Sequence, residues 1–366
     1  MNPILLVAGA RPNFMKIAPV LRALAARGLP RALVHTGQHY DTSLSQVFFD
    51  ELGIPAPDVH LDVGSGTHGA QTARVLEAFE RHLLEAVPRP RGVVVVGDVN
   101  STMAATLAAV KLGIPVAHVE AGLRSFDRGM PEEVNRLVTD AIADLLLCSE
   151  PSGVENLARE GVAKEKVHLV GNVMIDTLAR ELEGARRVDQ ARALGLQPGE
   201  LALVTLHRPS NVDGRERLEA LLGFLERVAA RLPVVFPAHP RTRARLEAFG
   251  LSARAEAIRG LHLCAPLPYR ANLSLMASAR VVITDSGGIQ EETSFLGIPC
   301  LTLRPSTERP VTVTLGTNTI VGEDLGKAEA LVDDILAGRY KSGAPIPKWD
   351  GHAAERVVDV LARAWG

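Results

Sequence analysis

Short runs of consecutive apolar residues alternate with helical patterns along the whole chain, and this alternation limits the possible fold more than any other feature. In the first half the runs are ILLVA (4–8), RALVH (31–35), GVVVV (92–96), PVAHV (115–119), LLLCS (145–149) and VHLVG (167–171). The patterns between them predict helices that include 13–27, 101–112 and 132–143. Because a continuously apolar strand is buried on both faces, strands of this kind separated by helices predict a parallel sheet covered on both sides.

The second half of the chain starts the same pattern again. Its strands are predicted at LALVTL (201–206), PVVFPA (233–238), VVITD (281–285) and PCLTL (299–303). The stretches 93–119 and 281–303 share an order of strand, Asp with small polar residues, helix, Leu-Gly-Ile-Pro and strand. A length of 366 residues suits two domains. We therefore expect an α/β protein of two doubly wound, Rossmann-like domains with a cleft between them.

Composition argues against several classes of function. The net charge of −2, the pI near 6.6 and the absence of a basic run argue against binding to nucleic acid or to a membrane surface. The cysteines Cys148, Cys264 and Cys300 lack metal-binding spacing and are typical of reduced thiols in a cytosolic protein. The N-terminal apolar run has no basic region before it and predicts a first strand, and no run is as long as a membrane span. We expect a cytoplasmic protein.

The segment GSGTHG (64–69) matches the dinucleotide-binding pattern G-x-G-x-x-G, but its position is wrong. It follows LDV instead of the first strand, and no second strand ending in an acid follows at the usual distance. A loop before a helix at 70–86 explains it better, so we expect no nicotinamide cofactor.

Two strand–helix turns have the chemistry of phosphate sites. In the turn at 9–16, glycine permits close approach of the backbone, and Arg11 and Lys16 are suited to phosphate. In the turn at 285–288, a Ser and two glycines form a nest for a diphosphate, and Glu292 beyond them could accept hydrogen bonds from ribose hydroxyls. Ordinary helix-start chemistry is the alternative for both turns, but it does not account for two consecutive glycines.

Acidic side chains follow the strands of the first half. Asp98 follows VVVVG and Glu120 follows PVAHV, while Glu132 and Glu133 open a helix after Pro131. Acids after proline are common at helix starts, and we interpret Glu133 in this way. Carboxylates near predicted phosphate ligands favour a site for a phosphorylated carbohydrate, with the acids transferring protons.

Nine motifs occur in order along nearly the whole chain. They are GARPNFMKIAPV, TGQHYD, VVGDVNST, HVEAGLRSFDRGMPEEVNR, GNVMID, TLHRPSNVD, HPRT, TDSGGIQEE and TERP. Together they resemble the non-hydrolysing UDP-N-acetylglucosamine 2-epimerases. The resemblance implies the GT-B fold, with an N-terminal domain of 1–172, a UDP-binding domain of 173–350, and a C-terminal helix (351–366) that packs back on the first domain.

The resemblance also implies a reaction. The family eliminates UDP across C1–C2 to leave 2-acetamidoglucal, then re-adds UDP with a proton delivered to C2 from the other face. By similarity the catalytic positions are Asp98, Glu120, Glu132 and His207, with acid and base not assigned. The UDP-contacting positions are Arg11, Lys16, Ser286, Gly287, Gly288, Glu292 and Arg309. The family implies no metal or other cofactor, a homodimer, and a role in supplying ManNAc-derived sugars for surface polysaccharide.

Some positions depart from the common bacterial pattern. Asn13 and Val311 replace glutamates, and Tyr40-Asp41 replaces the Arg of members that a second UDP-sugar activates. TGQHYD, SGTHG and SFDRGMPEE are closer to a branch that contains epimerases of UDP-2,3-diacetamido-2,3-dideoxyglucuronate, whereas the intact TERP favours UDP-GlcNAc. A GT-B glycosyltransferase, a hydrolysing relative and a UDP-sugar sensor are further alternatives.

Overall fold

The computed structural model describes residues 2–37 and 51–366, without the side chain of Arg11. Its contacts divide the chain into unit 1, Met1–Arg180 with Pro347–Gly366, and unit 2, Glu181–Ile346. The predicted boundary after residue 172 coincides with the start of α7 (Val173–Val188), and the division by contacts falls inside that helix.

Unit 1 contains a parallel sheet with the strand order β3-β2-β1-β4-β5-β6-β7. Its strands are β1 (Ile4–Ala8), β2 (Arg31–His35), β3 (Val59–His60), β4 (Gly92–Val96), β5 (Val116–Val119), β6 (Leu145–Cys148) and β7 (Val167–Leu169). All five residues of β1 and of β4 are buried, as continuous apolar runs predict for strands covered on both faces. The predicted strands of this half are confirmed, and β3 was not predicted.

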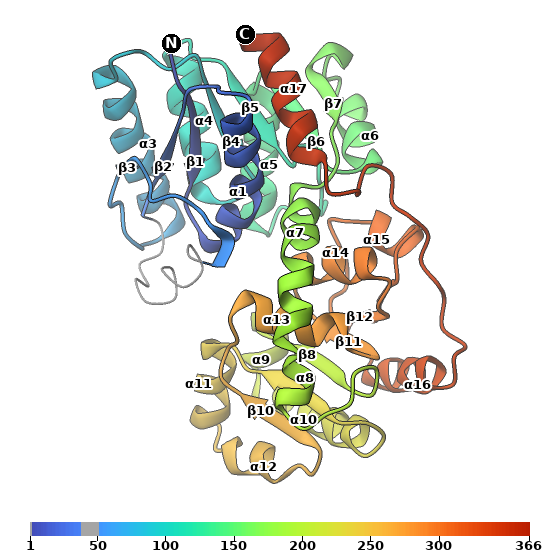
Figure 1. Ribbon diagram of the computed structural model, residues 1–366. Coiled ribbons are helices and arrows are strands. Elements are labelled where there is room, and N and C mark those ends of the chain that lie inside the picture. The colour runs from blue at the N-terminus through green and yellow to red at the C-terminus, as the bar shows by residue number, and fades with distance from the viewer. Residues whose placement is uncertain (1, 38–50) are drawn as a thin grey trace. The chain divides into compact units, whose positions relative to one another are not determined.

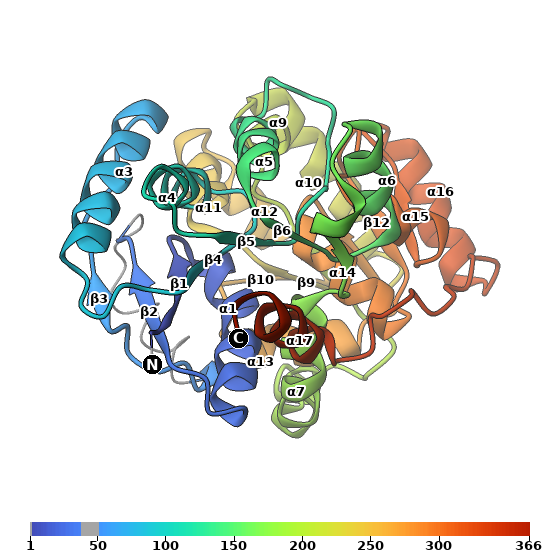
Figure 2. The ribbon, with the colours of Figure 1, turned by 90° about the horizontal axis from the view of Figure 1, so that it is seen from above.

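Helices cover both faces of this sheet. They are α1 (Arg11–Ala26), α3 (His68–Glu85), α4 (Asn100–Lys111), α5 (Pro131–Ile142), α6 (Pro151–Arg159), the 3-10 turn η1 (Lys164–Lys166), the first part of α7, and α17 (Ala353–Trp365). Figure 2 shows α3, α4 and α5 on one face and α1 and α17 on the other. In α3 the buried residues Val75, Phe79 and Leu83 recur every four positions, so one stripe of the helix faces the sheet.

The C-terminal helix α17 lies beside α1 (Figures 1 and 2). Its start is held by Asp176 of α7, whose carboxylate accepts hydrogen bonds from the Ala353 and Ala354 N–H groups at 3.0 and 2.6 Å. These N–H groups lack partners within the helix, so a residue 177 positions away in the chain acts as its N-terminal cap.

Unit 2 contains a second parallel sheet, with the order β10-β9-β8-β11-β12-β13. Its strands are β8 (Ala202–Thr205), β9 (Val234–Pro237), β10 (Leu261–Cys264), β11 (Val281–Thr284), β12 (Cys300–Thr302) and β13 (Asn318–Ile320). Its helices are α8 (Gln190–Ala193), α9 (Pro209–Val212), α10 (Arg215–Ala229), α11 (Pro240–Ala248), α12 (Ser252–Ala257), α13 (Tyr269–Ala277), α14 (Gly287–Leu296), α15 (Val311–Thr314) and α16 (Leu325–Leu336).

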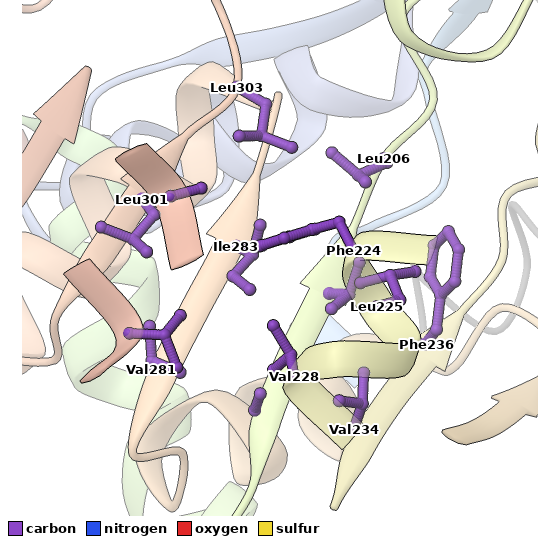
Figure 3. Packing of buried hydrophobic residues seen from close by; sticks show 14 of the residues in the cluster. Leu206, Phe224, Leu225, Val228, Val234, Phe236, Val281, Ile283, Leu301 and Leu303 are labelled. Carbon is purple, nitrogen blue, oxygen red and sulfur yellow. The ribbon is translucent and has the colours of Figure 1, made fainter. Parts of the chain in front are cut away.

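The main core of unit 2 lies between the sheet and the helices α10 and α16. Phe224, Leu225 and Val228 on α10 pack against Val234 of β9 and Ile283 of β11 (Figure 3). All five are at most 1% exposed, so the helix and the strand ends are fixed relative to each other by close packing.

Both sheets have the strand order of the doubly wound fold, in which the chain direction of the crossovers reverses beside the first strand. This reversal lies between β1 and β4 in unit 1 and between β8 and β11 in unit 2. Ligands of doubly wound domains bind outside the carboxyl ends of the strands at this point. The predicted pair of α/β domains is confirmed, and each domain is therefore expected to carry its site at that edge of its sheet. In the described part of the chain, no helix is long and apolar enough to cross a membrane.

Candidate active site

The two predicted acids of unit 1 lie at the carboxyl ends of neighbouring strands. Asp98 stands two residues beyond β4, and Glu120 directly follows β5. Glu120 has a φ of +74°, a left-handed conformation that is uncommon for residues other than glycine and is costly to hold. Strain of this kind is concentrated at functional sites, so the backbone itself marks Glu120 as a candidate.

Lys16, from the second turn of α1, forms an ion pair with Glu120. Both side chains are buried, with 9% and 7% of their surface exposed. Gly97 leaves room for the pair, because a Cβ at this position would lie 3.2 Å from Lys16 Nζ and 3.4 Å from the nearer Glu120 oxygen. The structure therefore brings together two residues that the sequence assigns to different tasks.

Arg136 of α5 holds Asp98. Its Nη1 donates to Asp98 Oδ2 at 2.5 Å, and the guanidinium is buried while the carboxylate is 28% exposed. The other edge of the guanidinium binds Glu133, with Nη2 and Nε at 2.8 and 3.1 Å from Glu133 Oε2. One cation thus fixes the exposed carboxylate from behind, and it was not identified from the sequence.

The interpretation of Glu133 as simple helix-start charge is wrong. Its carboxylate is buried and also accepts hydrogen bonds from the backbone N–H groups of Ser125 and Phe126 at 2.9 and 3.0 Å. Burial alone would raise the pKa of Glu133, but the donors of Ser125 and Arg136 bring it below its usual value. Glu132, the predicted catalytic acid, is exposed on the first turn of α5, and its role stays a prediction.

A buried histidine supports the turn that carries Asp98. His118 of β5 lies with Nδ1 2.6 Å from Asp140 Oδ1 and Nε2 2.8 Å from the carbonyl oxygen of Gly97. Both ring nitrogens are therefore engaged by buried oxygen atoms. Burial would raise the pKa of Asp140, but His118 and Arg124 lower it. The ring thus bridges Asp140 and the carbonyl of Gly97 and anchors the peptide preceding Asp98.

In unit 2, His207 stands two residues beyond β8, next to Asp285 at the end of β11. The Nδ1 atom of His207 lies 3.0 Å from Asp285 Oδ1, and the same carboxylate accepts from the backbone N–H of His207 and of Arg208. The carboxylate is fully buried, whereas the imidazole is 40% exposed. A buried acid therefore orients an accessible histidine.

The Gly-rich turn at the start of α14 lies beneath a buried arginine. A Cβ placed on Gly287 would lie 3.2 Å from Arg309 Nη1, so glycine leaves room for the guanidinium beside the turn. Arg309 Nε donates to Glu291 Oε1 at 2.5 Å. Ser286 occupies the position before the helix, and Ser286, Gly287 and Gly288 are half-buried. The structure thus gathers an arginine, a hydroxyl and a helix N-terminus, which together suit an anion.

Glu292, a predicted ribose ligand, is buried, and its Oε1 accepts a hydrogen bond from the Tyr269 hydroxyl at 2.9 Å. Burial raises the pKa of Glu292 to about 7, with the hydrogen bond from Tyr269 opposing the shift and Glu291 adding to it. Near neutral pH the side chain is therefore protonated in part of the molecules.

Two predicted features lie outside what the structure describes: the side chain of Arg11 and the pair Tyr40-Asp41. Asn13, one of the departures from the bacterial pattern, is described and is buried. Its Oδ1 accepts from the Ala10 N–H at 2.9 Å, and its Nδ2 donates to the Val96 carbonyl at 2.9 Å. Asn13 therefore ties the first turn of α1 to the end of β4.

Among residues 2–37 and 51–366, no group of three or more His, Cys, Asp and Glu side chains is placed to hold a metal ion. The prediction of a reaction without a metal stays a prediction.

The residues that position the acids of unit 1 were not predicted from the sequence, for two different reasons. Arg136 could have been noticed because it lies three residues after Glu133 on one helix, a spacing that brings side chains together. His118 and Asp140 gave no local signal, since their contact depends on how β5 meets α5.

Comparison with known proteins adds an independent finding. The family model for UDP-N-acetylglucosamine 2-epimerase matches residues 22–362. The UDP-N-acetylglucosamine 2-epimerase of Methanocaldococcus jannaschii is 40% identical over 361 residues, which cover 97% of this chain and 98% of that protein. The UDP-2,3-diacetamido-2,3-dideoxy-D-glucuronate 2-epimerase of Pseudomonas aeruginosa is 42% identical over 98% of this chain and 99% of its own.

Solved structures give the same result. A crystal structure of the M. jannaschii enzyme in complex with UDP-GlcNAc and UDP matches with a TM-score of 0.89 and 38% identity, over 99% of this chain and 100% of the other. The Neisseria meningitidis UDP-GlcNAc 2-epimerase bound to UDP-GlcNAc matches with a TM-score of 0.88 and 27% identity, with the same coverage.

Proposed function

The chain belongs to the UDP-N-acetylglucosamine 2-epimerase family and is an isomerase of nucleotide sugars, and we propose that it interconverts UDP-GlcNAc and UDP-ManNAc with the residues described above. The observation that carries the assignment of the acids is their placement. Asp98 and Glu120 follow the adjacent strands β4 and β5, the first two strands on one side of the reversal in unit 1, and each is held by a buried cation.

The reaction explains why such carboxylates are needed. The hydrogen at C2 is not adjacent to a carbonyl, so its removal must be coupled to departure of UDP from C1. A carboxylate takes the C2 proton, the C–H electrons form the C1=C2 double bond of 2-acetamidoglucal, and the C1–O bond breaks with its electrons leaving on UDP. Re-addition reverses these steps, with the proton delivered to the opposite face of C2. We assign these proton transfers to Asp98, Glu120, Glu132 and His207 as a group.

The leaving UDP needs fixed positive charge and hydrogen-bond donors. We propose that Ser286, Gly287, Gly288 and Arg309 bind the diphosphate and that Glu292 binds the ribose. The nest at the start of α14 and the buried Arg309 beside it support the first part of this assignment. Arg11 and Lys16 are proposed as further ligands of UDP from unit 1.

A second substrate is favoured by one observation. The P. aeruginosa enzyme that acts on UDP-2,3-diacetamido-2,3-dideoxy-D-glucuronate is 42% identical over nearly the whole chain. The same elimination and re-addition would apply, because that sugar also inverts at C2. We therefore propose this uronate as the alternative substrate, and as the second compound to assay.

We also propose that the enzyme works as a cytoplasmic homodimer and supplies ManNAc-derived sugars for a surface polysaccharide. Size-exclusion chromatography with light scattering tests the dimer directly. A mass equal to one chain across the working range of concentration would contradict it.

Proton NMR of the purified protein with UDP-GlcNAc in D2O tests the function. We expect deuterium at C2 together with the appearance of UDP-ManNAc, and a decrease in kcat of about 100-fold or more in Glu120→Gln and Asp98→Asn. The matched control is Glu165→Gln, since Glu165 is exposed in η1.

Each other outcome of the NMR experiment selects a different reading. Free ManNAc with UDP would indicate a hydrolysing enzyme, and transfer only to an added acceptor would indicate a glycosyltransferase. Retention of protium at C2 with unchanged UDP-GlcNAc would show that UDP-GlcNAc is not the substrate. Turnover of the diacetamido-uronate under the same conditions would then establish the alternative.

A further inference from the structure

The end of β11 carries a buried carboxylate that is not among the residues proposed to transfer protons or to bind UDP. Asp285 directly follows β11, and its N–H donates to the carbonyl of Thr205 at 3.2 Å, so the sheet register fixes it beside the end of β8. The carboxylate is fully buried, and the proposed diphosphate nest begins at the next residue, Ser286. A buried charge at this place needs a reason.

Four donors surround the Asp285 carboxylate and account for its charge. Oδ1 faces His207 Nδ1 at 3.0 Å, and both oxygens face the His207 N–H. Oδ2 also accepts from the Arg208 N–H at 2.9 Å and from Asn211 Nδ2 at 3.1 Å. Burial would raise the pKa of Asp285, but these donors, with His207 first, lower it below its usual value.

An ionised carboxylate can only accept hydrogen bonds, so the ring of His207 must present a proton at Nδ1. The neutral ring then has its lone pair on Nε2. In the part of the chain that the structure describes, no hydrogen bond occupies Nε2, and the imidazole is 40% exposed. The arrangement directs the basic nitrogen away from the protein interior.

We propose that Asp285 is the positioning residue of His207: it fixes the Nδ1–H tautomer and stabilises the imidazolium when Nε2 takes up a proton during the reaction. Asp285 touches neither substrate nor the reacting atoms in this proposal. The inference rests on the proposed function for its catalytic consequence, but the tautomer itself does not depend on which substrate the enzyme uses.

The substitution Asp285→Asn gives a sharp test, because the surrounding donors dictate how the amide must lie. The Arg208 N–H and Asn211 Nδ2 both need an acceptor at the Oδ2 position, so the new amide oxygen must occupy it. The amide NH2 then takes the Oδ1 position and points at His207 Nδ1. A donor there requires an unprotonated Nδ1, so the tautomer is expected to invert to Nε2–H.

The experiment is long-range proton–nitrogen NMR of the full chain with ¹⁵N-labelled histidine, at a pH where the ring is neutral. The signals of His207 are assigned by their loss in His207→Gln. We expect Nδ1–H in the unmodified protein and Nε2–H in Asp285→Asn. The unmodified protein alone decides the first part, so the test survives if the variant does not fold. An Nε2–H tautomer in the unmodified protein would overturn the proposal.

Kinetics then separate positioning from loop support. We expect Asp285→Asn to lower kcat by about 100-fold or more, with the Kd for UDP changed by less than about threefold. The control is Asn211→Ala, which removes another hydrogen bond to Asp285 but leaves its contact with the imidazole, and should lower kcat less than about threefold. Equal losses in the two variants, or an inverted tautomer with full kcat, would contradict the proposal. Failure of the proposed function is distinct, because the unmodified enzyme would then leave UDP-GlcNAc unchanged.

Discussion

At the scale of single residues, each proposed functional group is held by a neighbour that complements its charge. Buried cations hold Asp98 and Glu120 in unit 1, and buried acids hold His207 and Arg309 in unit 2. Such pairing removes conformational freedom before a substrate arrives, so the groups need little rearrangement when charge develops in the reaction. Apart from Lys16, which is also a proposed UDP ligand, the residues that organise the proposed site have no direct role in the chemistry.

Glu292 leads to a prediction about pH. Its pKa is raised from 4.5 to about 7 in the folded protein, so the folded state binds the proton more tightly than the unfolded state. The stability that this proton brings is present below about pH 4.5 and is lost as the pH rises toward 7. Glutamine is neutral throughout, so Glu292→Gln should gain stability relative to the unmodified protein between pH 5 and pH 8, by roughly 2 kcal/mol.

Urea unfolding at pH 5 and pH 8 measures this difference. Glu200→Gln is the matched control for loss of one glutamate, since Glu200 is exposed. The same substitution should weaken UDP binding if Glu292 contacts the ribose. A stability difference that is equal at both pH values would show that Glu292 is not protonated in the folded protein near neutrality.

At the scale of elements, short continuous apolar runs predicted most strands of both sheets, and three strands without such a run escaped prediction. The predicted strands of both sheets occur within one or two residues of their expected bounds. β3, β10 and β13 have the sequences VH, LHLC and NTI and were missed because none of them is a continuous apolar run. These strands form by pairing with β2, β9 and β12, and such pairing between distant segments cannot be read from the local sequence.

The helix α17 gives a prediction at this scale. Asp176→Ala removes the acceptor for two N–H groups at the start of the helix, Ala353 and Ala354, and leaves both buried without that partner. We expect a loss of about 1–3 kcal/mol and faster hydrogen exchange over 353–365. Thermal unfolding and hydrogen exchange with mass spectrometry measure the two effects.

A control on the same helix tests whether the cap, and not charge in general, is responsible. Asp359 forms an ion pair with Arg27, and both side chains are more than 40% exposed. Because exposed pairs contribute little, Asp359→Ala should change stability by less than about 1 kcal/mol. Similar losses from both substitutions would refute a specific capping role for Asp176.

At the scale of the whole molecule, the sequence predicted which candidate residues follow the strands, but it did not predict which side chains they contact. The positions of Asp98, Glu120 and His207 after strands can be recognised in the sequence, because the apolar runs stop just before them. The pairing of Lys16 with Glu120 joins residues 104 positions apart, and it exists only because β1, β4 and β5 are neighbours in one sheet. The contrast between buried Glu133 and exposed Glu132 likewise depends on how α5 faces the sheet, which two adjacent acids do not reveal.

The division into two units leads to a last prediction, which compares the segments that UDP and UDP-GlcNAc protect from hydrogen exchange. UDP contains the diphosphate and ribose of the substrate but not its N-acetylhexosamine, so it should protect the segments 286–292 and 307–310 of unit 2. At a concentration of 100 times its Kd, it should stabilise the segments that it orders by up to about 2.7 kcal/mol. UDP-GlcNAc should add protection at 97–98 and 119–121, where the proposed acids Asp98 and Glu120 lie. Protection of those strand ends by UDP alone would mean that they bind the nucleotide and not the sugar, and the carboxylates would then lose their proposed role in proton transfer at C2.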